Sequence, residues 1–159
     1  MRELPYDRLA TVEYARKWAF GRNPAYFDFD GMGGDCTNFA SQCIYAGSGV
    51  MNFTPVIGWY YIDLNRRAPA WTGVQFLCDF LLSNRGLGPM ARLCRREDLF
   101  PGDIVQIRRG DLFVHSLVVT YSSGEKVYIA SHTYDSLDND LDNYICDEFR
   151  YLHIEFVRK

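Results

Sequence analysis

The sequence predicts an α+β fold in one domain, with N-terminal helices packed on a C-terminal antiparallel β-sheet. Apolar residues recur at helical spacing as far as Gly86, whereas β-branched residues and alternating apolar and polar residues prevail after Pro89. Elements in that order are typical of α+β folds. The chain of 159 residues is 48% hydrophobic, which suffices for one core, and no repeat or low-complexity linker divides it. We therefore expect residues 1–159 to form a single domain.

The segments with helical spacing are bounded by residues that favour helix ends. Asp35 is a good N-cap residue, and Gly47 stands where the helix that follows Asp35 should end. Thr72 and Gln75 have the spacing of a capping box, in which two side chains satisfy backbone N–H groups of the first turn. The pattern predicts helices over residues 6–20, 35–46 and 72–83.

Segments of the second half have the composition of β-strands, and they cover residues 104–107, 114–121, 127–131 and 151–157. Residues 122–125 form the expected hairpin turn between the second and third strands, where Gly124 supplies the positive φ that such turns need. Residues 49–70 have no periodic pattern, so we expect a long irregular loop that covers part of the molecule.

Composition excludes two classes of partner. With 17 basic and 20 acidic residues, the chain has no excess of positive charge to bind nucleic acid. No apolar stretch is long enough to cross a membrane. The N-terminal residues lack the apolar region of a signal peptide, so we expect a cytoplasmic protein unless the sequence is a domain cut from a secreted chain. The oligomeric state is left open by the sequence.

The cysteines point to a candidate nucleophile. Their number, 5, is odd and no CxxC pair occurs, so neither a disulfide framework nor a zinc ribbon is indicated. Cys36 falls in the first turn of the second expected helix, where the helix N-terminus favours the thiolate and free N–H groups can bind an oxyanion. The alternative is a small buried residue, which is the interpretation for Cys43 and Cys78 on apolar helix faces.

A cysteine nucleophile needs a base, and the chain has 3 histidines. His115 opens an expected strand, so its imidazole can project from the end of the sheet toward a helix end. His132 closes the next strand, so a tight hairpin would bring it to the same end of the sheet. His153 alternates with apolar neighbours along its strand and is interpreted as solvated.

The sequence contains two sets of side chains that could be metal ligands, one for calcium and one for zinc. Asp138, Asp140 and Asp142 have the spacing of the first EF-hand ligands, but Phe149 stands where a bidentate Glu is required, so we expect a solvated acidic loop. Cys36, His115 and His132 could together hold a catalytic zinc ion, although nothing in their spacing demands it. We expect no metal.

Three short motifs resemble those of NlpC/P60-type cell-wall peptidases in the papain-like superfamily. Residues 34–39 (GDCTNF) resemble the D-C-S-G signature of the nucleophile helix, residues 101–105 (PGDIV) resemble the PGD motif before a strand, and residues 115–119 (HSLVV) resemble the strand that carries the base. The chain also resembles the putative amidase domain family of this superfamily. That resemblance covers nearly the whole chain, through residues 14–19, 22–26, 33–42, 58–61, 71–74 and 132–135.

The resemblance implies a papain-like fold and a cysteine amidase or peptidase that needs no cofactor. Cys36 would attack the amide carbonyl as a thiolate paired with a His115 imidazolium, and a third polar residue would orient the imidazole. His132 is the first choice for that third residue and Asp135 the alternative.

The same resemblance suggests where a substrate would bind. Asp35 and Asn38 flank the nucleophile, and Trp59 and Trp71 could form an aromatic rim around the cleft. The expected substrate is a peptide or small amide, with the stem peptide of peptidoglycan as one candidate. Two rival interpretations are a catalytically silent module that binds peptide or glycan in the same groove, and a zinc hydrolase that uses Cys36, His115 and His132.

Overall fold

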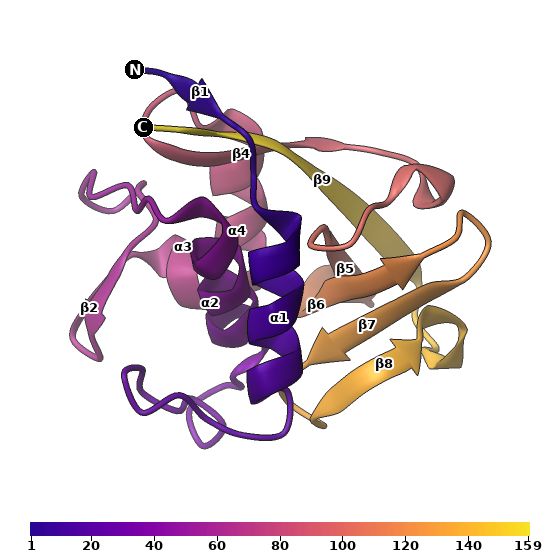
Figure 1. Ribbon diagram of the computed structural model, residues 1–159. Helices are drawn as coiled ribbons and strands as arrows, with labels where there is room; N and C mark the ends of the chain where they lie inside the picture. The colour runs from indigo at the N-terminus through magenta and orange to yellow at the C-terminus, as the bar shows by residue number, and fades with distance from the viewer.

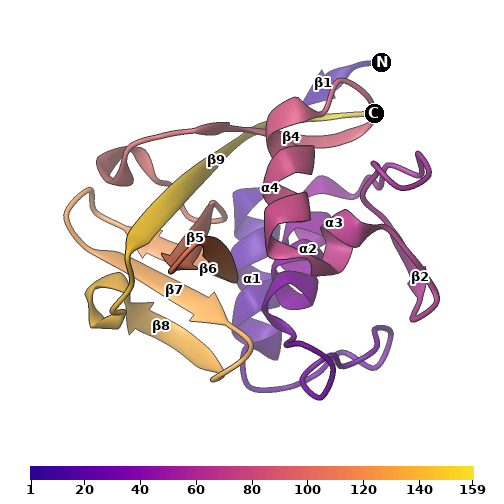
Figure 2. The same ribbon diagram turned by 180° about the vertical axis from the view of Figure 1, so that it is seen from behind.

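The computed structural model describes residues 1–159 and has the predicted α+β architecture (Figure 1). Helix α2 lies between α1, which is nearest the viewer in Figure 1, and α4, which is nearest in Figure 2. The helices are α1 (Arg8–Trp18), α2 (Cys36–Ser48), α3 (Pro69–Thr72) and α4 (Val74–Ser83), with short 3₁₀ turns η1 (Arg96–Asp98) and η2 (Leu141–Asn143). None of these helices is long and apolar enough to span a membrane.

The helices pack on a 7-stranded antiparallel sheet with the order β1-β9-β5-β6-β7-β8, and β4 also pairs with β9. Because β1 joins β9, the two chain termini lie side by side (Figure 1). The strands are β1 (Glu3–Leu4), β4 (Gly88–Leu93), β5 (Ile104–Arg109), β6 (Leu112–Ser122), β7 (Val127–Ser131), β8 (Ser136–Asp140) and β9 (Glu148–Arg158). A separate small sheet pairs β2 (Tyr61–Asp63) with β3 (Arg66–Arg67).

The four predicted strands are confirmed as parts of β5, β6, β7 and β9, and the turn between β6 and β7 has Gly124 at φ 91° as expected. Two predictions were wrong here. Residues 49–70 are not irregular throughout, because they contain the β2–β3 hairpin and the start of α3. The acidic stretch is not a loop throughout either, because Asp138 and Asp140 lie in β8 and Asp142 lies in η2. Asp138 pairs with Arg16 at 2.6 Å and Asp140 with Lys126 at 2.9 Å.

The ends of the predicted helices also required correction. Gly47 does not end α2, which continues to Gly49 at φ 65°. Gly47 instead allows α1 and α2 to approach closely, since a Cβ there would lie 2.1 Å from Thr11 Oγ1. The capping box at the third helix does not form, because Thr72 ends α3 and accepts a hydrogen bond from Arg67 Nε, and Gly73 is the N-cap of α4.

The residue Asp103 of the PGD motif ties the first helix to the sheet. It is fully buried, and its carboxylate accepts hydrogen bonds from Arg8 at 2.7 Å and from the backbone N–H of Ile154 at 3.0 Å. His153 lies 2.8 Å from the same carboxylate, so the prediction that this histidine is solvated was wrong. The motif is therefore a structural anchor between α1, β5 and β9.

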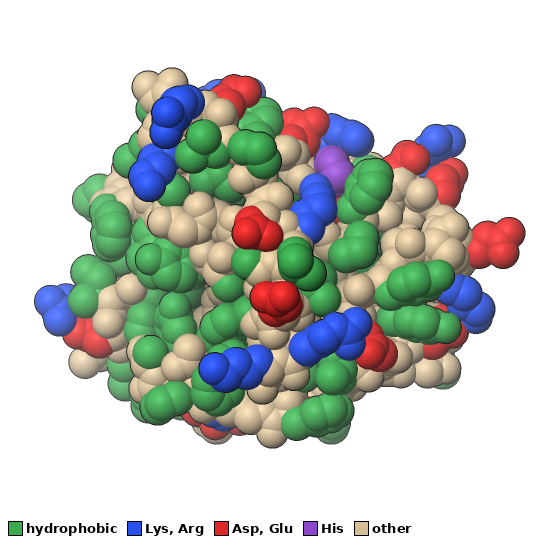
Figure 3. Space-filling model, in the orientation of Figure 1, with side chains coloured by type: hydrophobic (Ala, Val, Ile, Leu, Met, Phe, Trp, Pro, Cys, Tyr) green, Lys and Arg blue, Asp and Glu red, His purple; other side chains and the backbone are tan.

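Charges on the surface are mixed rather than segregated. Figure 3 shows basic and acidic side chains interspersed on the face that Figure 1 presents, in keeping with the net charge of −3. This face offers no basic patch for a phosphate backbone.

Candidate active site

Cys36 is the first residue of α2, at the point where that helix packs against β6. Its side chain is 7% exposed and forms no disulfide. Burial raises the pKa of the Cys36 thiol above its usual value, while the backbone of Ser116 and the hydroxyl of Thr37 act in the opposite direction. Burial therefore disfavours the thiolate form of Cys36, whereas the hydrogen bonds and the helix N-terminus favour it.

Asp35 occupies the N-cap position as predicted, but its side chain caps nothing. Its carboxylate accepts hydrogen bonds from His132 Nδ1 at 2.5 Å, from Asn38 Nδ2 at 2.8 Å and from the backbone N–H of Phe29 at 2.9 Å. Burial raises the pKa of Asp35, but these hydrogen bonds outweigh burial and hold the pKa below its usual value. The N–H groups of the first turn of α2 consequently receive no side-chain cap and can hold an oxyanion.

His115 lies on β6, directly before Ser116, and is 8% exposed. Burial, with a smaller contribution from the charge of Arg109, lowers the pKa of His115 to about 4. The imidazole is therefore neutral near pH 7 and can accept a proton. No hydrogen bond joins it to the sulfur of Cys36, whose one side-chain partner is Thr37.

A cavity of about 210 Å³ opens beside His115, and neither Asp35 nor Cys36 at the start of α2 is among its lining residues. Thr133 connects the cavity to the start of α2, because it lines the cavity and its Oγ1 accepts a hydrogen bond of 3.1 Å from the backbone N–H of Asp35. Thr133 and Tyr134 have φ angles of 59° and 61°, a left-handed conformation that is strained for a β-branched residue. The cavity is lined by Arg109, Val114, His115, Thr133, Tyr134 and Tyr144.

The structure does not bring His132 or Asp135 into hydrogen-bond contact with His115. The His132 ring stacks on Phe39 with centroids 3.9 Å apart, and its Nε2 lies 2.8 Å from the carbonyl oxygen of Trp18. Asp135 forms an ion pair with Arg22 at 3.0 Å. Within the turn between β7 and β8, the residues that share a cavity with His115 are instead Thr133 and Tyr134. A role for His132 or Asp135 in orienting the base therefore stays a prediction.

Trp59 and Trp71 do not form the expected aromatic rim, because both are fully buried. The indole N–H of Trp71 donates to Asn38 Oδ1 and that of Trp59 donates to Ser41 Oγ, each at 3.0 Å. Since a buried indole N–H needs a partner, these bonds fix α2 in the core. Asn38 is also buried, so it and the tryptophans support helix α2 rather than line an open cleft.

Sequence reasoning missed three buried polar residues that are linked to Cys36 by hydrogen bonds, namely Thr37, Ser116 and Gln106. A signal was present at Gln106, which is a polar residue at a fully buried position between Val105 and Ile107 of a central strand. Buried polar side chains are costly unless they are hydrogen-bonded, so such a position indicates a specific partner.

The family of the chain follows from comparison with known proteins. Residues 5–154 match the family model described as "Putative amidase domain", which is most of the chain. The chain belongs to this amidase family. Membership in the family indicates amidase-type hydrolysis.

One curated relative of the amidase family is the uncharacterized protein YhbB of Bacillus subtilis (strain 168). It is 36% identical to this chain over 140 residues, which are 85% of the chain and 44% of the relative. The chain thus spans less than half the length of that protein. No solved structure was found to match the chain.

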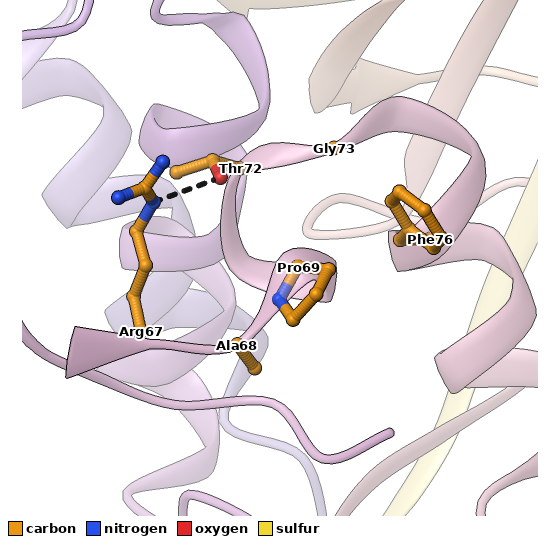
Figure 4. Close-up of a pocket in the computed structure, with 6 residues that line it drawn as sticks. All are labelled: Arg67, Ala68, Pro69, Thr72, Gly73 and Phe76. Carbon is orange, nitrogen blue, oxygen red and sulfur yellow. Dashed lines mark hydrogen bonds between the residues drawn. The ribbon is translucent and has the colours of Figure 1, made fainter. Parts of the chain in front are cut away.

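A larger cavity of about 380 Å³ lies at the junction of α3 and α4 (Figure 4). Arg67 and Thr72 face each other on one side of it, joined by a hydrogen bond of 3.1 Å, and Phe76 lies on the other side. Its lining contains neither a cysteine nor a histidine.

The ligands expected for a zinc site are not gathered. His132 faces Asp35 and Trp18 beneath α2, and no group of three His, Cys, Asp or Glu side chains is placed to hold a metal ion. The donor set that a zinc hydrolase would need is therefore incomplete in this arrangement.

Proposed function

We propose that the protein is a cysteine-dependent amidase with a papain-like arrangement of nucleophile and base. The supporting observation is the position of Cys36, which begins α2 and contacts the backbone of Ser116, the residue that follows His115 on β6. A thiol at a helix N-terminus, packed against a strand whose histidine borders a cavity, supplies the nucleophile and base that acyl transfer needs.

The proposed reaction passes through a thioester. As the sulfur of Cys36 attacks the amide carbonyl carbon, the neutral His115 accepts the thiol proton, and the N–H groups of the first turn of α2 hold the oxyanion. The C–N bond then breaks and His115 returns the proton to the departing amine. A water molecule attacks the thioester while His115 again accepts a proton, and collapse of the intermediate releases the carboxylic acid and restores the thiol.

The pKa directions favour this general-base route over the thiolate–imidazolium pair predicted from the sequence. Burial raises the pKa of Cys36 and lowers that of His115 to about 4, so both groups are neutral in the free protein near pH 7. The proton then moves during attack rather than before it.

The charge of the cavity suggests a class of substrate. Arg109 lines the cavity with His115, and its one hydrogen bond is a long contact of 3.4 Å to the carbonyl oxygen of Ile145. The adjacent Arg108, in contrast, is paired with Glu148 at 3.0 Å. An unpaired guanidinium recognises carboxylates, so the preferred substrate is an amide with an anionic group near the scissile bond. Peptides with acidic residues, including cell-wall stem peptides, fall in this class.

The test is hydrolysis of a panel of amides, with and without a neighbouring carboxylate, followed by release of the amine. Activity that is lost in Cys36→Ala and in His115→Ala, but kept in Cys43→Ala, supports the proposal. Hydrolysis that survives Cys36→Ala would refute it. Tight binding of a panel member without turnover would instead favour a silent binding module, and activity abolished by a metal chelator would favour a zinc hydrolase.

A further inference from the structure

A chain of buried hydrogen bonds runs from the surface to the sulfur of Cys36. Arg150 on β9 donates to Gln106 Oε1 through Nε at 3.1 Å and Nη2 at 2.5 Å. Gln106 Nε2 donates to Ser116 Oγ at 3.1 Å. Ser116 Oγ lies 3.0 Å from Thr37 Oγ1, which lies 3.7 Å from the sulfur of Cys36. Gln106, Ser116 and Thr37 are at most 1% exposed.

The chemistry of Arg150, at the outer end of this hydrogen-bond chain, determines which group donates in each hydrogen bond. A guanidinium has only donors, so Arg150 holds the carbonyl oxygen of Gln106 and turns its amide NH₂ toward Ser116. Ser116 Oγ is thereby an acceptor, and its own buried proton needs an acceptor in turn. Thr37 Oγ1 is the remaining partner, and its proton is then directed at the sulfur of Cys36.

If the hydrogen bonds were donated in the opposite direction, one buried donor would lack an acceptor. If the Cys36 thiol donated to Thr37, then Thr37 would donate to Ser116, and the hydroxyl proton of Ser116 would be buried without an acceptor. Such a group is costly in a protein interior. Every donor in the chain is satisfied when the sulfur is the acceptor, which is the role of a thiolate.

We propose that Arg150, Gln106, Ser116 and Thr37 form a positioning chain that directs a hydrogen bond from Thr37 onto the sulfur of Cys36 and stabilises its thiolate form. The inference rests on the proposed cysteine chemistry and extends it to four residues outside the cavity. This hydrogen-bond chain offsets part of the cost that burial imposes on a charged sulfur. It also accounts for a glutamine and a serine facing each other across two central strands, where apolar residues would otherwise pack.

The outer end of the chain is held in place independently of Cys36. The Arg150 guanidinium lies 3.6 Å from the centre of the Phe113 ring and also donates to Gln75 Oε1 at 3.2 Å. Among the other titratable groups on the two elements, Asp35 directly precedes Cys36 and is paired with His132, and His115 directly precedes Ser116 on β6. None of these belongs to the chain, so its effect can be tested separately.

The experiment measures the rate of Cys36 alkylation by iodoacetamide over roughly pH 6 to 11 in the full chain, with the modified residue located by mass spectrometry. Thr37→Val keeps the shape of the side chain but removes the hydroxyl, and it should raise the midpoint of the profile by about one pH unit. Thr37→Ser restores the hydroxyl and should return the midpoint to that of the wild type. Arg150→Met, at the far end, should shift the midpoint the same way by about half a unit.

Thr120→Val is the matched control, because Thr120 is a buried threonine on β6 whose hydroxyl donates to Asp138 at 2.8 Å, away from Cys36. Its profile should equal that of the wild type. Equal midpoints in Thr37→Val and the wild type, or a midpoint in Thr37→Ser that follows Thr37→Val, would overturn the inference. If Thr37→Val fails to fold, an unshifted profile in Arg150→Met would overturn it instead.

The failure of this inference is distinguishable from that of the proposed function. Alkylation reports the ionisation of Cys36 whether or not any amide is hydrolysed. A shifted midpoint in Thr37→Val, together with amide hydrolysis that survives Cys36→Ala, would support the positioning role of the hydrogen-bond chain and refute the cysteine amidase mechanism.

Discussion

Helix α2 carries Cys36 as its first residue and Cys43 near its middle, and the comparison between them shows what distinguishes a candidate nucleophile from a packing residue. Cys36 and Cys43 are both buried, and burial raises the pKa of both thiols. Cys43 packs in the largest hydrophobic cluster beside Ala40 and Ile44. Cys36 instead meets a hydroxyl, a strand that carries a histidine, and uncapped N–H groups. Burial is common to both cysteines, whereas polar surroundings that can stabilise a charge belong to Cys36 alone.

The largest expected difference between the two cysteines is in activity. Cys36→Ala should lower amide hydrolysis by at least about 10³-fold, because no other thiol can form the thioester. Cys43→Ala should leave kcat within about twofold and show only a loss of stability of about 1–2 kcal/mol from the cavity that it creates. Turnover assays on both variants, with thermal unfolding as the control for folding, check the comparison. Equal activity losses would remove the distinction.

The next largest effect concerns stability and distinguishes the surroundings of Cys36, through the carboxylate of Asp35 that precedes it. Asp35→Asn should reduce the free energy of unfolding by about 2–3 kcal/mol, because Asp35 is a buried charged acceptor for His132, Asn38 and Phe29. Denaturant unfolding at pH 7 measures this loss.

The pH dependence of the same variant sharpens the test. Because the folded protein holds the pKa of Asp35 below its unfolded value, the carboxylate stabilises the protein above the unfolded pKa and loses that effect as pH falls through the folded pKa. The difference in unfolding free energy between wild type and Asp35→Asn should therefore shrink below about pH 4. A difference that does not change with pH would contradict the assigned pKa direction.

A third prediction concerns the protonation of the nucleophile itself. With the pKa of Cys36 raised and that of His115 lowered to about 4, alkylation of Cys36 should continue to accelerate above pH 9. His115→Ala should abolish amide hydrolysis yet move the midpoint of the alkylation profile by less than about half a unit. Rapid alkylation below pH 7 that disappears in His115→Ala would instead indicate a preformed thiolate–imidazolium pair.

The smallest expected effect tests the charge at the mouth of the site. Iodoacetate and iodoacetamide are similar in size, but only iodoacetate carries a carboxylate. Arg109→Gln should lower the ratio of the iodoacetate rate to the iodoacetamide rate at Cys36 about threefold. Arg108→Gln, which removes an arginine already paired with Glu148, should leave this ratio unchanged. The difference should vanish at high salt, and equal ratios at low salt would exclude Arg109 from recognition of anionic groups.

The contrast between Asp35 and Trp71 illustrates how far the sequence could be used to predict the site. The N-cap position of Asp35 was predictable because capping depends on residues close in the chain, but its side chain binds His132, 97 positions away. Trp71 was expected at a rim, yet its ring is fully buried because its N–H finds Asn38 on α2. Local preference fixes where a residue stands in an element, and long-range partners decide what its side chain does.

The sequence by itself determined the order of helices and strands, the start of α2 at Cys36 and the hairpin turn at Gly124, because periodicity, capping and turn chemistry operate over a few residues. Only the tertiary structure decided that His132 binds Asp35 and that Thr133 lines a cavity together with His115. It also decided that Arg150 is connected to Cys36 by hydrogen bonds that begin at Gln106. These pairings depend on strand register and on which polar groups are buried together, and both are properties of the packed chain rather than of any local segment.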